Sequence, residues 1–215
     1  MIAKSSLTTQ LHLMLQFAKR DLYLYRHRVM NYLINYALIY PCWHAFAFGY
    51  LQGNLYFTSA QSIKGTTLLA GNFLLVIILL TYKLSIELLF DLEHQRCIEY
   101  QMLILRPPYI LIQKIVFTAL FASVILLPYY PCAKLLLGSF FVTQNLSFPG
   151  FFGMLLASCL MASSYNHLIA VALKSSDNLG KIWRRLNVPL FNLGGFLIPW
   201  YAINNWSPLL GRLVF

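Results

Sequence analysis

Acidic residues are scarce in this sequence: six Asp and Glu stand against sixteen Lys and Arg in 215 residues. Charged residues of both signs make up only 10% of the chain, whereas a soluble globular domain carries about 25%. Hydrophobic residues make up 59%. This shortage of charge excludes a water-soluble globular protein and a disordered chain. It indicates an all-α, polytopic membrane protein that forms a single domain over residues 1–215.

Several motifs that carry chemistry are also missing. The four cysteines form no CxxC pair, and the five histidines show no HExxH or other metal-ligand spacing. The only GK pair, Gly180 and Lys181, has Ser175 where a Walker A loop needs its first glycine. There is no GxSxG elbow either. We therefore expect no catalytic residue, metal site or cofactor in this chain and regard an enzyme as a minority interpretation.

Long uncharged stretches are abundant. They predict five membrane-spanning helices near 30–51, 66–86, 109–131, 149–172 and 186–202. Thirteen of the sixteen basic residues fall before the first span or in the second and fourth connections, when Lys83 and Lys114 at the adjoining ends of their spans are counted with the second connection. Because short basic loops stay in the cytoplasm, we expect a cytoplasmic N-terminus, with the positive charge beside anionic lipids and no nucleic-acid partner.

All six acidic residues fall on the same predicted cytoplasmic side, and none is expected at the centre of the membrane. A carrier driven by protons or sodium ions usually keeps ionisable groups there. The distribution therefore argues against ion coupling.

Two predicted cytoplasmic segments are patterned. In residues 1–28, apolar residues recur at spacings of three and four opposite a basic polar side, which predicts an amphipathic helix along the interface, either an anchor or a contact surface for a partner. In residues 83–108, the acids Glu87, Asp91 and Glu99 share one helical side with a glutamine, and Glu93 can pair with Arg96. Pro107 and Pro108 should end this connection and start the third span. It is either a loop that follows the membrane surface or a docking element for a soluble protein.

The C-terminal stretch 189–215 is rich in helix breakers. Gly194 and Gly195 are followed by Pro199, which makes one straight helix improbable, and Trp200 is suited to the outer headgroup level. The pattern predicts a broken helix or re-entrant hairpin on the outer side, with a simple interfacial hairpin as the alternative.

Taken in this order, these segments resemble the type-2 ATP-binding-cassette (ABC) transporter permeases, the membrane subunits of many bacterial exporters. The resemblance covers nearly the whole chain. It rests on the N-terminal amphipathic helix, on the acidic connection that ends in Leu103 to Pro107, and on the stretch from Gly194 to Trp200. The family has six spans per subunit, whereas this sequence accounts for five and ends at Phe215 without the last one.

The resemblance implies a function. A permease subunit of an ATP-driven exporter would sit in the bacterial inner membrane, pair with a second copy as a homodimer and bind a separate cytoplasmic ATPase that carries the ATP. Glu87, Asp91, Glu93, Arg96 and Glu99 would form the ATPase-coupling segment. Gly194, Gly195, Pro199 and Trp200 would form the outer hairpin. The alternatives are a non-transporting protein that binds and regulates a complete permease, and a small membrane enzyme acting on lipids.

Overall fold

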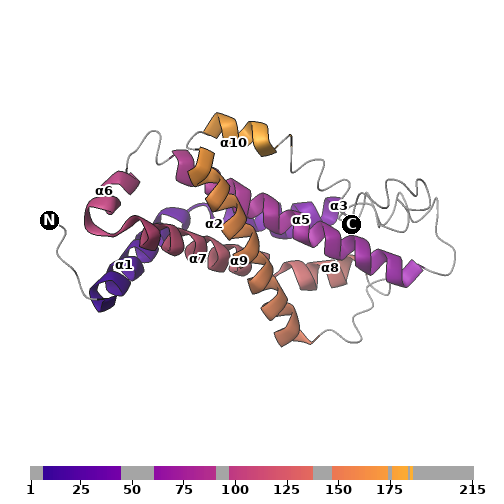
Figure 1. Ribbon diagram of the computed structural model, residues 1–215. Coiled ribbons are helices and arrows are strands. Elements are labelled where there is room, and N and C mark those ends of the chain that lie inside the picture. The colour runs from indigo at the N-terminus through magenta and orange to yellow at the C-terminus, as the bar shows by residue number, and fades with distance from the viewer. Residues whose placement is uncertain are drawn as a thin grey trace.

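The computed structural model describes residues 7–44, 61–90, 97–137, 147–173, 176–183 and 185 of the chain. Nearly all of these residues are helical and none is in a strand, which confirms the predicted all-α class (Figure 1). The elements are α1 (Leu7–Tyr25), α2 (Val29–Tyr32), the π-helix η1 (Leu33–Ile39), α3 (Tyr40–His44), α5 (Gln61–Phe90), α6 (Cys97–Ile104), α7 (Pro107–Leu126), α8 (Tyr129–Leu137), α9 (Phe148–Leu173) and α10 (Ser176–Ile182).

Among the described residues, three helical stretches are long and apolar enough to cross a membrane: Phe73–Phe90, Pro107–Cys132 and Phe148–Leu173. They correspond to the predicted spans 66–86, 109–131 and 149–172. Helix α5 has 30 residues, which at 1.5 Å per residue gives about 45 Å and exceeds the hydrocarbon thickness of about 30 Å. It can therefore extend beyond the hydrocarbon core.

The other two predicted spans are described in part or not at all. The segment 30–51 is described as far as His44, and its apolar helical stretch Val29–Ile39 is shorter than a crossing requires. The segment 186–202 lies outside the described residues, as does the predicted hairpin with Gly194, Gly195, Pro199 and Trp200.

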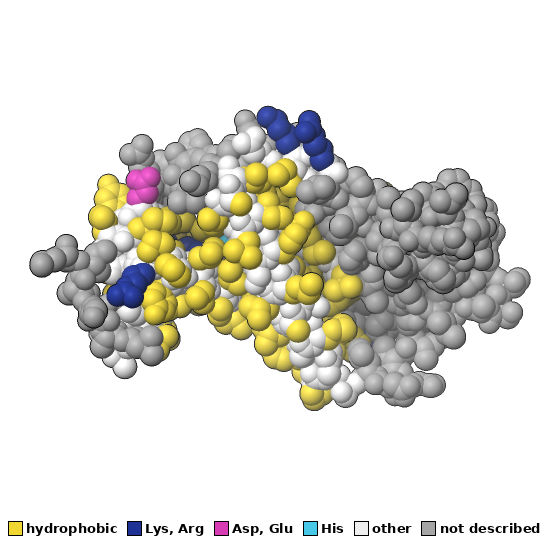
Figure 2. Space-filling view, viewed as in Figure 1, with side chains coloured by type: hydrophobic (Ala, Val, Ile, Leu, Met, Phe, Trp, Pro, Cys, Tyr) yellow, Lys and Arg dark blue, Asp and Glu magenta, His cyan; other side chains and the backbone are white. Residues whose placement is uncertain are grey.

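Helix α9 packs against both α5 and α7 and forms the main core with them. Phe73 of α5 anchors one end of this core, since its ring centroid lies 4.6 Å from that of Tyr129 and 5.6 Å from that of Phe151. Apolar side chains also cover the surface over these helices (Figure 2). Val124 and Met161, for example, are 66% and 79% exposed. Helices that are apolar on their buried and exposed sides alike are typical of a bundle surrounded by lipid.

The connection between α5 and α7 contains a short helix of its own. Helix α6 ends at Ile104, Arg106 is extended, and Pro107 and Pro108 occupy the first turn of α7. Proline fits there because the first helical N–H groups have no intrahelical acceptor. The structure thus confirms that these prolines end the connection and start the next span.

Candidate functional site

Helix α1 confirms the predicted N-terminal helix and turns two polar residues into the bundle. Gln10 and Asp21 are buried, whereas Leu11, Leu15 and Leu22 are each more than half exposed. Helix α1 contacts α7. An orientation with leucines outward and polar residues inward is suited to a helix that faces lipid on one side and protein on the other.

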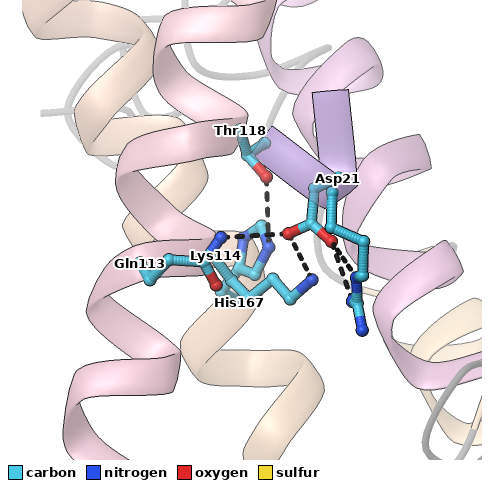
Figure 3. A network of polar contacts seen from close by, with 6 residues as sticks. Asp21, Gln113, Lys114, Thr118 and His167 are labelled. Carbon is cyan, nitrogen blue, oxygen red and sulfur yellow. Dashed lines mark hydrogen bonds and ion pairs between the residues drawn. The ribbon is translucent and has the colours of Figure 1, made fainter. Parts of the chain in front are cut away.

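The carboxylate of Asp21 is the centre of a buried polar network (Figure 3). Its Oδ2 accepts hydrogen bonds from Nζ of Lys114 at 2.6 Å and from Nε2 of Gln113 at 3.0 Å. Its Oδ1 accepts from Nη2 and Nε of Arg20 at 2.8 and 3.3 Å. The side chain of Asp21 is 2% exposed and that of Lys114 is 12% exposed. A buried ion pair therefore joins α1 to the helix that begins at Pro107.

This burial of Asp21 differs from what the sequence suggested. Asp21 is one of the six acids on the predicted cytoplasmic side, and no sequence pattern indicates a partner for it. In the structure its partner Lys114 lies inside the candidate span Pro107–Cys132. The presence of Lys114 in the predicted span 109–131 was the one feature of the sequence that indicated a buried partner, because a charge within an apolar helix is tolerated mainly when it is paired. The two residues are 93 positions apart, so spacing could not reveal the pair.

Electrostatics keep Asp21 ionised at neutral pH. Burial by itself would raise the pKa of this carboxyl group. The nearby charge of Lys114 and the hydrogen bonds from Lys114, Gln113 and Arg20 outweigh burial and hold the pKa of Asp21 below its ordinary value of 3.8.

The network extends from α1 to α6. Gln101 of α6 is 2% exposed. With its amide oxygen turned toward Arg20, it accepts hydrogen bonds from Nη1 and Nη2 of Arg20 at 2.7 and 2.6 Å. Arg20 in turn binds Asp21, which binds Lys114. A continuous chain of polar contacts therefore links α6, α1 and α7.

A second group of polar contacts lies between α7 and α9. Nδ1 of His167 donates to the carbonyl oxygen of Ser163 at 2.9 Å, and the hydroxyl of Thr118 lies 3.4 Å from Nε2 of His167. His167 is 1% exposed. Among the described residues, no group of three His, Cys, Asp or Glu side chains could hold a metal ion. His167 is therefore a buried residue that packs between α7 and α9.

The predicted coupling residues have different environments. Glu87 at the end of α5 accepts hydrogen bonds from Nη1 of Arg28 at 2.9 Å and from the hydroxyl of Tyr32, so its carboxylate is used within the molecule. Glu99 is exposed on α6. The remaining three, Asp91, Glu93 and Arg96, lie outside the described residues.

A cavity of about 660 Å³ lies where α1, α5, α7 and α9 come together. Asp21 and Lys114 line it together with Glu87, Thr118 and His167. Figure 2 shows basic and histidine side chains between hydrophobic ones in this part of the surface. The cavity therefore combines buried charge with apolar walls and is within the size range of small-molecule sites.

Comparison of the chain with protein-family models, with curated proteins and with solved structures finds no match.

Proposed function

We propose that this protein is the membrane-spanning subunit of an ATP-driven exporter of the type-2 ABC permease class. It would work as a homodimer in the bacterial inner membrane, with its N-terminus in the cytoplasm and ATP bound by a separate ATPase. Segments 30–51 and 186–202 would bring the number of spans to five, and the stretch 189–215 would form the outer hairpin. The observation that carries the proposal is α6, a short helix between α5 and α7, which are the second and third spans of the proposed arrangement.

Helix α6 has the properties of a docking element. Its outward side combines an acid with apolar residues, since Glu99 is exposed and Tyr100 and Leu103 are 68% and 73% exposed. Exposed aromatic and aliphatic anchors beside a charge are common at protein interfaces. Asp91, Glu93 and Arg96 precede this helix and would extend the contact. Because the carboxylate of Glu87 is occupied by Arg28 and Tyr32, we assign Glu87 a structural part in the coupling segment.

The inward side of α6 offers a route by which force could reach the spans. Ile98 and Leu105 are buried in one cluster with Leu88 of α5 and Ile110 of α7. Gln101 adds the polar chain through Arg20 to Asp21 and Lys114. A push on α6 by an ATPase that closes on ATP would therefore move α1 and α7 together. Rigid-body movement of this kind is a usual way for a transporter to open its binding site to one side of the membrane and then to the other.

The test alters the exposed side of α6 and leaves its buried side unchanged. We expect Leu103→Asp combined with Glu99→Ala to abolish co-purification of the protein with its proposed cytoplasmic ATPase and stimulation of the ATP hydrolysis of that ATPase. The matched control is Leu135→Asp on α8, where the leucine is 85% exposed. Equal behaviour of both variants would contradict docking through α6.

Reconstitution with that ATPase separates transport from the alternatives. We expect ATP-dependent efflux of the exported compound from proteoliposomes. Binding of the ATPase without any efflux would favour the regulatory interaction protein, and turnover of lipid without ATP would favour the membrane enzyme.

A further inference from the structure

The cavity between α1, α5, α7 and α9 carries more positive than negative charge. Its lining contains four basic side chains and two carboxylates: Arg20, Arg28, Lys83, Lys114, Asp21 and Glu87. A concave site with an excess of one sign of charge and low-dielectric walls concentrates the field and attracts ions of the opposite sign. The composition of the lining therefore favours an anionic ligand.

Both carboxylates already have cations as partners. Asp21 binds Arg20 and Lys114, and Glu87 binds Arg28. In the part of the chain that the structure describes, Lys83 is exposed and has no ion pair or hydrogen bond. The uncompensated positive charge thus has two sources. One is Lys83, and the other is the presence of two cations, Arg20 and Lys114, around the single carboxylate of Asp21.

The surroundings of these cations are apolar. The cavity walls include Leu24, Tyr25, Phe90 and Phe117, and the outer surface of α1 next to it exposes Leu22 and Leu24. A small hydrophilic anion would gain little from such walls. A ligand with a charged head and hydrocarbon chains matches both parts, because its head can meet the cations while its chains follow the leucines of α1.

We infer that this cavity binds the phosphate of an anionic lipid head group, with Lys83 as a direct ligand and the exposed Arg28 as a second basic residue of the lining. Lysine and arginine are the usual partners of phosphate oxygens. Basic pockets between membrane helices are also known to receive lipid head groups. The inference does not rest on an exporter function, since the cavity lies within one chain and needs no ATPase.

The experiment uses the full chain in a non-ionic detergent and measures binding of short-chain phosphatidylglycerol by calorimetry. Short-chain phosphatidylcholine, which has the same phosphate but no net charge, is the comparison lipid. We expect tighter binding of phosphatidylglycerol. We expect Lys83→Gln to weaken that binding about fivefold, which corresponds to about 1 kcal/mol for one basic residue near an anionic lipid surface.

Two further variants make the result specific to this site. Lys83→Arg keeps the charge and should bind phosphatidylglycerol like the natural chain. Lys134→Gln removes a basic residue from α8, outside the cavity lining, and should leave binding unchanged. Because Lys83 is exposed, Lys83→Gln should keep the melting temperature, which circular dichroism can check.

Three outcomes would overturn the inference. Equal affinity for the two lipids would remove the anion preference. Equal weakening by Lys83→Gln and Lys134→Gln would reduce the effect to general surface charge. Displacement of the lipid by inorganic phosphate at a similar concentration would assign the cavity to free phosphate. No ATPase is present in these measurements, so each outcome leaves the exporter proposal to its own test.

Discussion

The substitution Asp21→Asn removes the negative charge at the centre of the buried network and keeps the shape of the side chain. Lys114 then holds its charge at 12% exposure without its counter-ion. Breaking a buried ion pair from one side costs about 3–5 kcal/mol. Arg20 is 37% exposed and can turn toward water, so the loss of its ion pair with Asp21 adds little to the cost. We expect Asp21→Asn to lower the free energy of unfolding by about 3 kcal/mol.

Removing both charges should cost less than removing one. In Asp21→Asn combined with Lys114→Met the only charge left without its partner is that of Arg20, which is 37% exposed, and buried pairs replaced by apolar groups are often close to neutral. We expect a loss of about 1 kcal/mol for this double variant. The assay is reversible unfolding in mixed micelles, followed by circular dichroism as a double-mutant cycle.

Glu87→Gln is the comparison, because its partner Arg28 is 60% exposed and the pair is accessible to water. An accessible pair is worth up to about 1 kcal/mol. An Asp21→Asn variant that lost no more stability than Glu87→Gln would refute the argument from burial. So would a double variant whose loss equalled the sum of the losses in Asp21→Asn alone and Lys114→Met alone.

Three further predictions follow from the same structure. The pKa of Asp21 is below 3.8 in the folded protein, so its stabilising contribution is complete above that pH and is lost as the pH falls through the lowered value; below about pH 4 the unfolding free energy should therefore fall more steeply in the natural chain than in Asp21→Asn, and parallel acid titrations would contradict this. Leu80→Ala removes a side chain that is 0% exposed and should cost about 2–5 kcal/mol in chemical unfolding, whereas Val124→Ala, at a position 66% exposed, should cost less than about 1 kcal/mol. In whole cells a membrane-impermeant maleimide should leave Cys97 unlabelled, whereas in inside-out vesicles it should label Cys97. The buried Cys159 should react only after denaturation. Labelling of Cys97 in intact cells would show that the orientation is the reverse of the one predicted.

Several features of the fold follow from local pattern. The apolar stretches around Phe73, Phe121 and Leu155 are long enough for membrane-spanning helices, and they appear as the helices α5, α7 and α9. The break at Pro107 follows equally from local chemistry, because proline lacks an N–H and restricts the residue before it. Such features depend on residues within a few turns of each other, which is why the sequence reveals them.

The candidate site depends on contacts that no local pattern contains. Asp21 and Lys114 lie 93 residues apart, and Arg28 and Glu87 lie 59 residues apart. From the sequence, Asp21 belongs to the basic polar segment before the first span, and its burial arises only because α1 lies against α7. The amphipathic pattern of α1 indicates a surface helix but does not say which side faces lipid.

Hydrophobicity and proline act locally along the chain, so the order of residues alone indicates a helical membrane protein, the positions of three candidate spans and the end of the connecting helix. The burial of one acid, the polar connection from α6 through α1 to α7, and the cavity lined by basic side chains from three helices all depend on how the helices pack. Charges can be compensated at a distance only after the helices pack, and packing brings together residues whose separation in the sequence carries no information about their pairing.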